Sequence, residues 1–375
     1  REKYLRDCDM RRKQFRGNHK TALERGGNII MKKRIISLAA AAVFVIGTLA
    51  GCGNSSTQTT DKTASSDASS SGGDLVTVRD AVMTGQLDQY ATEIGLWQGI
   101  FEKYGIDLQT TEFVAGINTI DAVVNGTADI GMMADYAAVN RLGNTLDATN
   151  LQIFSQISGG QAALSGGLYV DPKYADDPKS LDGSAGFMYQ EGTVTYYYAS
   201  KCIEYLGLDE SKQNLINTDS SQTRLALIQK GGASAVYANG SEAKYIEEAG
   251  WVQVATSQEI GIQTGSYFLS TDKYISENTD TLAKFLQAVD ESTQYINDHL
   301  DESAEYLADK LGLKAEDFKE NWKNYSFEPG FSEEATTHLE DIEKWGFEHG
   351  SFPKDYNVRD FINTDVAKIA FPDNV

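Results

Sequence analysis

The chain has 375 residues and a formal net charge of −21, with 41% hydrophobic and 23% charged residues. This length exceeds one ordinary core of roughly 150 residues and excludes a small scaffold stapled by disulfides. The acidic balance gives no support to a nucleic-acid-binding surface, which would be basic. Cys8, Cys52 and Cys202 lie far apart without a CxxC spacing, so they build neither a disulfide framework nor a cysteine zinc site.

The first 51 residues differ in charge from the rest, since they hold 12 Lys and Arg against 4 Asp and Glu. From Met31 the chain reads MKKRIISLAAAAVFVIGTLAGC, a basic run followed by an apolar stretch. That stretch is shorter than the roughly 18–20 residues of a membrane-spanning helix, so residues 31–51 are predicted to be a signal peptide. Because a signal peptide normally opens a protein, we expect Met31 to be the true start and residues 1–30 a misassigned leader. The alternative is a genuine basic leader.

The end of the predicted signal peptide, Leu49-Ala50-Gly51-Cys52, resembles the bacterial lipobox. The resemblance implies that Cys52 is lipidated, becomes the new N-terminus and anchors the protein on the extracytoplasmic face of a bacterial cell membrane. Residues 53–73 contain seven Ser and four Thr but no Leu, Ile, Val or aromatic residue. This composition predicts a flexible tether that spans about 25 Å between its ends.

From Leu75 onward, short β-rich runs alternate with longer helical patterns, which predicts an α/β fold with mostly parallel sheets. Ten strands suit two sheets, and the region after residue 278 is predicted to be helical. Thr193 is predicted to cap a helix in which Cys202 is a buried, unreactive residue. The predicted strands are 75–78, 106–113, 128–133, 151–157, 167–170, 185–189, 214–217, 233–238, 251–254 and 266–269.

Two motifs common in enzymes are missing from the sequence, which has no GxSxG elbow and no GxxxxGK phosphate loop. Its many carboxylates leave a glycosidase-like pair open by composition, but any chosen pair is weak evidence. After the signal peptide only His299, His338 and His349 remain, without an HxxxH or HExxH spacing, and we interpret them as surface residues. We therefore expect no catalysis, no cofactor and no metal.

Polar and glycine-rich segments cluster where strands end and helices begin, which is the ligand position of open α/β sheets. Turn and capping residues would look alike, so each segment has a purely structural alternative. The candidate ligand-binding residues are Thr84, Gly85, Gln86, Asp88, Gly116, Asn118, Ala134, Asp135, Tyr136, Gly192, Thr193, Val194, Thr195, Asp219, Tyr237 and Asn239.

Three stretches, IGLWQGIFEKYGID (94–107), AGINTIDAVVNGTADIGMMAD (115–135) and KSLDGSAGFMYQEGT (179–193), resemble solute-binding proteins of nitrate, sulfonate and taurine ABC importers. The resemblance covers most of residues 75–296. It implies a two-lobed type II periplasmic-binding-protein fold with two strand crossovers, a ligand cleft between the lobes and closure by hinge bending. Lobe 1 would comprise residues 74–169 and 262–375, and lobe 2 residues 170–261.

The chain departs from the family pattern in two of these segments. It lacks the lysines of the family's DLKGK segment at residues 181–185, and it lacks a family proline at residues 237–240. These departures leave the fold prediction unchanged but leave the ligand open.

The resemblance implies a monomeric lipoprotein that captures a small organic solute, such as a sulfonate or taurine, for a membrane permease with a separate ATPase subunit. Alternatives are a pyrimidine, vitamin-like or amine solute, a sensory lipoprotein without transport, or an enzyme of the pyrimidine-synthase-like superfamily. No nucleic acid is expected as a partner.

The charges near the candidate loops bear on the ligand. The loops at 83–88, 115–119, 133–136, 190–195, 219–222 and 237–240 contain no Lys or Arg, whereas Asp88, Asp135, Glu191 and Asp219 lie in or beside them. If two of these carboxylates point into the cleft, a bare anion such as nitrate is unfavourable and a zwitterion, amine or heterocycle is preferred. The alternative is that Asp88 and Asp219 only cap helices. Nearby tyrosines at 136, 196–198 and 237 suit stacking on a ring or a cation.

Overall fold

The computed structural model describes residues 75–146, 150–160, 166–183, 186–191 and 193–374. The predicted signal peptide, Cys52, the tether and Gly192 lie outside the described residues. The strands are β1 (Val76–Met83), β2 (Ile106–Phe113), β3 (Ile130–Ala134), β4 (Leu151–Gly160), β5 (Gly166–Val170), β6 (Gly186–Tyr189), β7 (Asn214–Asn217), β8 (Ala235–Asn239), β9 (Val252–Thr256) and β10 (Thr264–Thr271). All ten predicted strands are therefore present, with shifts at their ends.

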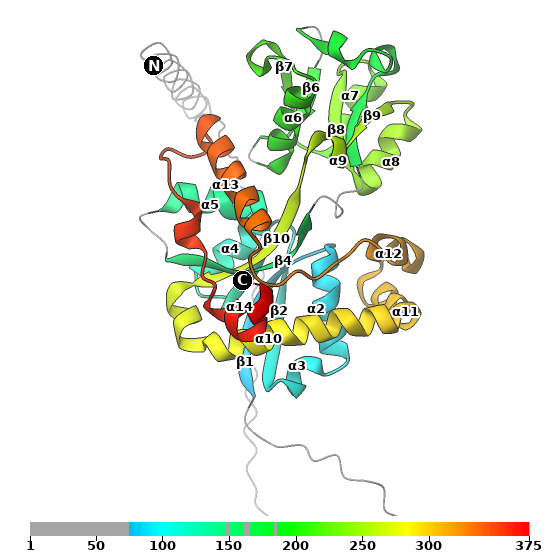
Figure 1. The fold of residues 1–375 in the computed structure, drawn as a ribbon. Helices are drawn as coiled ribbons and strands as arrows, with labels where there is room; N and C mark the ends of the chain where they lie inside the picture. The colour runs from blue at the N-terminus through cyan, green and yellow to red at the C-terminus, as the bar shows by residue number, and fades with distance from the viewer. Residues whose placement is uncertain (1–74, 147–149, 161–165, 184–185, 192, 375) are drawn as a thin grey trace, which may run out of the picture. The chain divides into compact units, whose positions relative to one another are not determined.

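Helices connect and cover these strands (Figure 1). The α-helices are α2 (Leu87–Trp97), α3 (Ile100–Lys103), α4 (Gly116–Val124), α5 (Asp135–Thr145), α6 (Val194–Tyr205), α7 (Ser221–Gln229), α8 (Gly240–Glu248), α9 (Ser257–Ile260), α10 (Asp272–Asp298), α11 (Leu300–Leu311), α12 (Ala315–Trp322), α13 (Glu333–Glu348) and α14 (Asp365–Ala370). Short 3₁₀ turns are η2 (Pro172–Tyr174), η3 (Pro178–Leu181), η4 (Glu210–Lys212), η5 (Val358–Phe361) and η6 (Pro372–Asn374). The predicted helical region after residue 278 is confirmed.

The strands form two five-stranded sheets, in the orders β2-β1-β3-β10-β4 and β7-β6-β8-β5-β9. The prediction of mostly parallel sheets is wrong, because each sheet is half antiparallel. Strand β10 runs antiparallel to both β3 and β4, and β5 runs antiparallel to both β8 and β9. Each of these two strands is the first one after the chain crosses to the other sheet, so both crossings bring the chain back in the reverse direction.

The topology places the first crossing between β4 and β5 and the return between β9 and β10. The two sheets therefore divide the body into two lobes, and the second lobe is inserted into the first. The residue boundaries that we predict for the lobes, 74–169 with 262–375 and 170–261, stay a prediction.

Hydrophobic packing covers both faces of each sheet. In the first sheet, Val78 and Val82 pack with Ile94 of α2 and Phe285 of α10, whereas Ala81 faces the opposite cluster. That opposite cluster also contains residues of the second sheet, and the remaining face of the second sheet is covered by α7 and α8. Helix α6 begins as predicted, since Thr193 is its N-cap and its side chain accepts a hydrogen bond from the backbone N–H of Thr195. Cys202 on this helix is fully buried, as predicted, and burial raises the pKa of its thiol.

A buried carboxylate, Asp135, joins three segments of the first lobe at the start of α5. Its Oδ1 accepts a hydrogen bond from the backbone N–H of Tyr136 at 2.6 Å, and its Oδ2 accepts one from the backbone N–H of Gly265 in β10 at 2.9 Å. The Nε2 of His338, on α13, lies 2.7 Å from the same Oδ2. His338 is only 6% exposed, so its interpretation as a surface residue is wrong. The carboxylate is fully buried but well satisfied.

A second buried carboxylate has no such support. Asp80 lies in the middle of β1, on the face that carries Val78 and Val82, and is 1% exposed. Within the described part of the chain, neither of its side-chain oxygens has a hydrogen-bond partner. Burial raises the pKa of Asp80 to about 8, because a desolvated carboxylate is stabilised in its neutral form.

The pKa of Asp80 predicts a pH-dependent stability. Since the folded-state value lies above the unfolded value, folded Asp80 keeps its proton while the unfolded chain loses it between about pH 4 and pH 8. The free energy of unfolding therefore falls by about 1.4 kcal/mol per pH unit in this window from this group alone. We expect Asp80→Asn to remove this slope and to raise stability at pH 7 by roughly 2–4 kcal/mol.

The measurement is urea denaturation from pH 5 to pH 8 on the wild type and the variant. Asp309→Asn, which removes the same charge from an exposed position of α11, serves as the control and should leave the slope unchanged. An equal slope in wild type and Asp80→Asn would show that Asp80 is ionised in the folded protein.

The contact between Asp135 and His338 predicts a large stability effect at a position remote in sequence. His338→Ala removes the side-chain partner of a buried carboxylate and should cost about 3 kcal/mol of unfolding free energy. Thr337→Ala, at an exposed position on the same helix, should cost far less. Denaturation at pH 7 measures both, and equal small effects would contradict the assignment.

Candidate functional site

The second lobe brings two strand ends together. Strands β6 and β7 are parallel neighbours that pair from Gly186 with Asn214 to Tyr189 with Asn217, so their carboxyl ends meet at one edge of the sheet. The side chain of Asn217 joins the two ends, because its Oδ1 accepts from the backbone N–H of Glu191 at 3.0 Å and its Nδ2 donates to Glu191 Oε2 at 3.2 Å. This is the edge at which ligands bind in open α/β sheets.

A cavity of about 450 Å³ opens at this edge. We call it the β6–β7 cavity. It is lined by Gln190, Glu191, Asn217, Thr218, Asp219 and Thr223. Its lining offers two carboxylates, two side-chain amides and two hydroxyl groups, and it contains no apolar side chain. Such a lining can bind a small polar molecule through hydrogen bonds and charge.

Asp219 precedes α7 and is held by hydroxyl groups at the start of that helix. Its Oδ1 accepts hydrogen bonds from Thr223 Oγ1 and from Ser220 Oγ, the latter at 3.1 Å. These two hydroxyl groups, Thr223 first, hold the pKa of Asp219 below its usual value, so the carboxylate is charged at neutral pH. The N-cap of α7 is Ser220, so the alternative that Asp219 caps this helix is wrong.

The cation next to the β6–β7 cavity is already neutralised. Arg224 is 5% exposed and forms two hydrogen bonds to Glu242, from Nε at 2.6 Å and from Nη2 at 2.9 Å. Its Nη1 donates to Thr218 Oγ1 at 3.3 Å, which fixes one wall of the cavity. The guanidinium thus belongs to a buried ion pair behind the cavity.

Thr193 and Thr195 support the cavity wall from the start of α6. Thr193 Oγ1 donates to the carbonyl of Gln190 at 2.9 Å, and Thr195 Oγ1 accepts from the backbone N–H of Gln190 at 2.8 Å. Val194 between them is half-buried. The structure therefore brings the predicted loops at 190–195 and 219–222 together, with these threonines in contact with the cavity-lining segment.

In the first lobe, the loop after β1 is closed by local hydrogen bonds. Thr84 Oγ1 donates to the carbonyl of Phe113 at 3.2 Å, and the backbone N–H of Gly85, whose φ is +76°, donates to the Gln89 side chain at 2.8 Å. Gln86, the N-cap of α2, is exposed.

Asp88 lies within α2 and is buried, so the alternative of a capping role is wrong for it too. Its Oδ2 accepts from Ser266 Oγ of β10 at 2.5 Å, and Ser266 Oγ lies 2.9 Å from Ser158 Oγ of β4. Burial raises the pKa of Asp88, although the hydrogen bond from Ser266 opposes the shift. The cluster joins two strands and a helix at one end of the first sheet.

The remaining candidates of the first lobe divide into packed and exposed residues. Gly116 is buried and has no room for a side chain, because a Cβ there would lie 2.9 Å from the Cβ of Met133. Asn118 is exposed and Ala134 is half-buried. Tyr136 is buried beside Trp345, with its hydroxyl 3.3 Å from Ser351 Oγ. Gly116 and Tyr136 therefore pack within the first lobe, whereas Asn118 is open to solvent.

Two candidates lie on β8 in the second lobe. Tyr237 is buried, its hydroxyl lies 3.0 Å from Ser257 Oγ, and its ring packs on Tyr198 with the centroids 4.5 Å apart. Asn239 precedes α8 and is exposed, without a side-chain capping bond. Neither residue lines the β6–β7 cavity.

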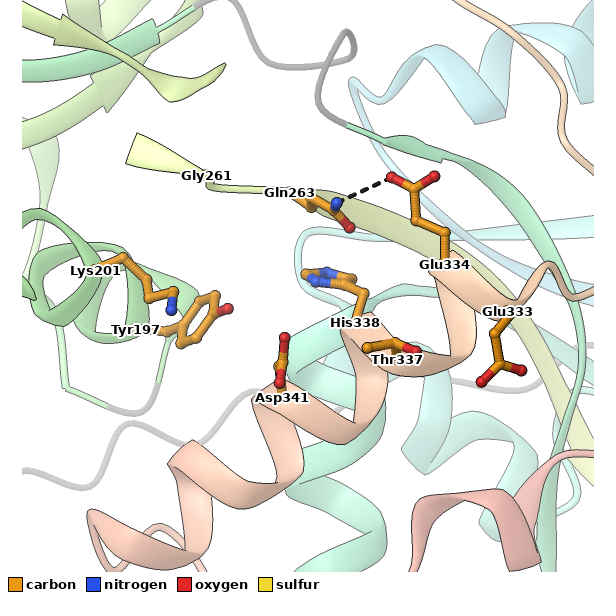
Figure 2. A pocket seen from close by; sticks show the side chains of 9 residues that line it. All are labelled: Tyr197, Lys201, Gly261, Gln263, Glu333, Glu334, Thr337, His338 and Asp341. Carbon is orange, nitrogen blue, oxygen red and sulfur yellow. Dashed lines mark hydrogen bonds between the residues drawn. The ribbon is translucent and has the colours of Figure 1, made fainter. Parts of the chain in front are cut away.

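A smaller cavity of about 270 Å³ lies between α6, α13 and the segment that returns to the first lobe. Figure 2 shows Tyr197 and Lys201 on α6 opposite His338 and Asp341 on α13, with Gln263 above His338 and next to Glu334. The Gln263 side chain donates to Glu334 at 3.0 Å. None of the predicted candidates lines this cavity, although His338 contacts Asp135 behind it.

Sequence reasoning missed Asn217, Thr218 and Thr223 as site residues. A usable signal was present, because Asn217 is the last residue of a predicted strand and Asp219 follows two positions later. Residues at the carboxyl end of a parallel strand are placed at the ligand edge by topology alone.

Solved structures of other proteins share this fold. Among solved structures, the aliphatic sulphonate binding protein SsuA of Escherichia coli is similar with a TM-score of 0.67 at 16% identity, covering 79% of this chain and 99% of that one. The MOPS-bound alkanesulfonate-binding protein SsuA of Xanthomonas axonopodis pv. citri gives 0.61 at 14% identity, with 78% and 100% covered. The nitrate-binding protein NrtA of Synechocystis PCC 6803 gives 0.57 at 15% identity, with 79% and 88% covered. These likenesses show the two-lobed periplasmic-binding-protein fold.

No curated protein matches the chain by sequence. A family model described as NMT1/THI5 like matches residues 94–303, which is more than half of the chain and includes strands of both sheets. The chain therefore belongs to the NMT1/THI5-like family.

Proposed function

We propose that the protein is the extracytoplasmic solute-binding component of an ABC importer and delivers a small organic solute to a separate permease. The β6–β7 cavity carries this proposal, because it places a polar lining at the ligand edge of an open sheet. The similar solved structures support it, since their descriptions name sulphonate-binding and nitrate-binding proteins. ATP hydrolysis would belong to another subunit.

In this proposal the two chain crossings act as a hinge. The solute binds to the second lobe, and the exposed candidates of the first lobe, Gly85, Gln86 and Asn118, close over it. The permease then recognises the closed form. Such a cycle needs binding and release and no bond breaking.

The enzyme alternative finds less support among the described residues. Cys202 is fully buried with a raised pKa, so it is a poor nucleophile. His338 is committed to buried Asp135, and the lining of the β6–β7 cavity contains neither histidine nor cysteine. Turnover of a bound solute would favour the enzyme over the importer component.

The proposal predicts stabilisation by one class of solute. Binding to the folded state alone raises the melting temperature, by about 5 °C or more at a hundredfold excess over Kd for a protein of this size. We would screen taurine, alkanesulfonates, nitrate, amines, pyrimidines and vitamins by thermal shift. Small-angle scattering on the stabilising solute should show a smaller radius of gyration.

Asn217→Ala should weaken that solute about tenfold, since it removes the side chain that positions Glu191. Asn214→Ala, at an exposed position at the start of the same strand, is the matched control and should leave affinity unchanged. Stabilisation without a change in scattering would contradict transport by lobe closure and favour the sensory alternative.

The N-terminal segment supports a lipid anchor as part of the proposal. No helix in the described part of the chain combines the length and the apolar character that a membrane span needs. The lipobox-like Leu49-Ala50-Gly51-Cys52 and the Ser/Thr-rich tether would hold the body near the outer face of the membrane.

A labelling experiment tests the anchor. When cells that express the protein are grown with radioactive palmitate, the protein should become radioactive. The Cys52→Ser variant should carry no label and should remain an unprocessed precursor. Cys202→Ser is the control, because this buried thiol is not a lipidation site. Equal labelling of the two variants would refute the anchor without bearing on solute capture.

A further inference from the structure

We propose that the β6–β7 cavity takes the cationic part of the solute, a protonated amine or a similar N–H-rich cation. This inference rests on the proposed function and names the chemical class that the site would recognise.

The lining of the cavity supplies acceptors for such a group. Glu191 uses Oε2 to accept from Asn217, and Asp219 uses Oδ1 to accept from Ser220 and Thr223. Both side chains are exposed, and the hydrogen bonds from the described residues reach them at Glu191 Oε2 and Asp219 Oδ1. Each carboxylate is thus held in place through one oxygen while the other remains for a donor. An ammonium group offers three N–H donors and a positive charge, which matches this pair.

The same lining lacks what an oxyanion would need. No Lys or Arg lines the cavity, and Arg224 behind it is held by both carboxylate oxygens of Glu242. A sulfonate or nitrate in the cavity would approach two carboxylates without a free cation to offset them.

The N-terminus of α7 does not replace the positive charge that an anion would need in the cavity. This helix end faces the cavity through Thr223, but its N-cap Ser220 already accepts from the backbone N–H of that residue at 3.2 Å. Asp219 stands beside this first turn with its own negative charge. A carboxylate therefore already faces the position that an anionic ligand would take at this helix N-terminus.

The test compares three probes with the same four-carbon chain: 1,4-diaminobutane, 1,4-butanediol and butane-1-sulfonate. Binding to the full chain is measured by titration calorimetry and thermal shift at two salt concentrations. We expect the diamine to bind at least tenfold more tightly than the diol or the sulfonate, and more weakly at high salt.

Three charge-removing variants identify the site of binding. Glu191→Gln and Asp219→Asn should each weaken the diamine about tenfold or more. Glu248→Gln, at an exposed position of α8 outside the cavity, removes the same charge from the same lobe and should leave its affinity unchanged. The melting temperature of each unliganded variant shows whether it is folded.

Three results would overturn the inference. Equal weakening by all three variants would mean that the diamine is only a counterion of an acidic protein. Absence of diamine binding would remove the cation preference. Tighter binding of butane-1-sulfonate, with a smaller radius of gyration in scattering, would also reject the cation site. That result would retain the proposed solute-binding function. The proposed function fails only if no solute of the wider panel binds and closes the lobes.

Discussion

The contacts of the Asp135 carboxylate hold together the part of the first lobe to which the chain returns. Backbone N–H groups of α5 and β10 and the ring of His338 on α13 all meet its two oxygens. Strand β10 is the segment by which the chain comes back from the second lobe, and it lies between β3 and the edge strand β4 of the first sheet. The position of β10 also places Ser266, which follows Gly265, in hydrogen-bond contact with Asp88. A buried carboxylate with several donors is therefore part of the frame and is not available to a ligand.

The same reasoning separates the acidic residues into two groups with different physical roles. Asp80, Asp88 and Asp135 are buried in the first lobe, where burial raises the pKa of Asp80 and Asp88 and protein donors satisfy Asp135. Glu191 and Asp219 instead line a cavity, and Asp219 keeps its charge because nearby hydroxyl groups stabilise it. Composition alone cannot make this distinction. It depends on which strand ends meet and on what surrounds each carboxylate.

Much of the fold could be predicted from the sequence because it depends on local patterns. The strands appear as short β-rich runs, the cap of α6 as Thr193, and the buried stripe of α10 as Leu282, Phe285, Leu286, Val289 and Ile296 at helical spacing, all of them buried. The direction of β10 and β5 could not be predicted, since it depends on how the chain returns after each crossing. Contacts between residues far apart in the sequence could not be predicted either. Asp88 contacts Ser266 at a separation of 178 residues, and Asp135 contacts His338 at a separation of 203 residues. The capping interpretation of Asp88 and the surface interpretation of His338 failed for this reason.

A shared fold does not fix the charge of the bound solute. The similar solved structures are described as binding sulphonate or nitrate, but identities of 14–16% carry the backbone arrangement and not the side chains of a site. In this chain the decisive local feature is the ion pair between Arg224 and Glu242. An unpaired arginine behind Thr218 would make the edge of β6 and β7 attractive to an anion. Because Glu242 neutralises Arg224, the net charge of the cavity lining comes from Glu191 and Asp219. These two carboxylates favour a cation, although the similar solved structures are described as binding anions.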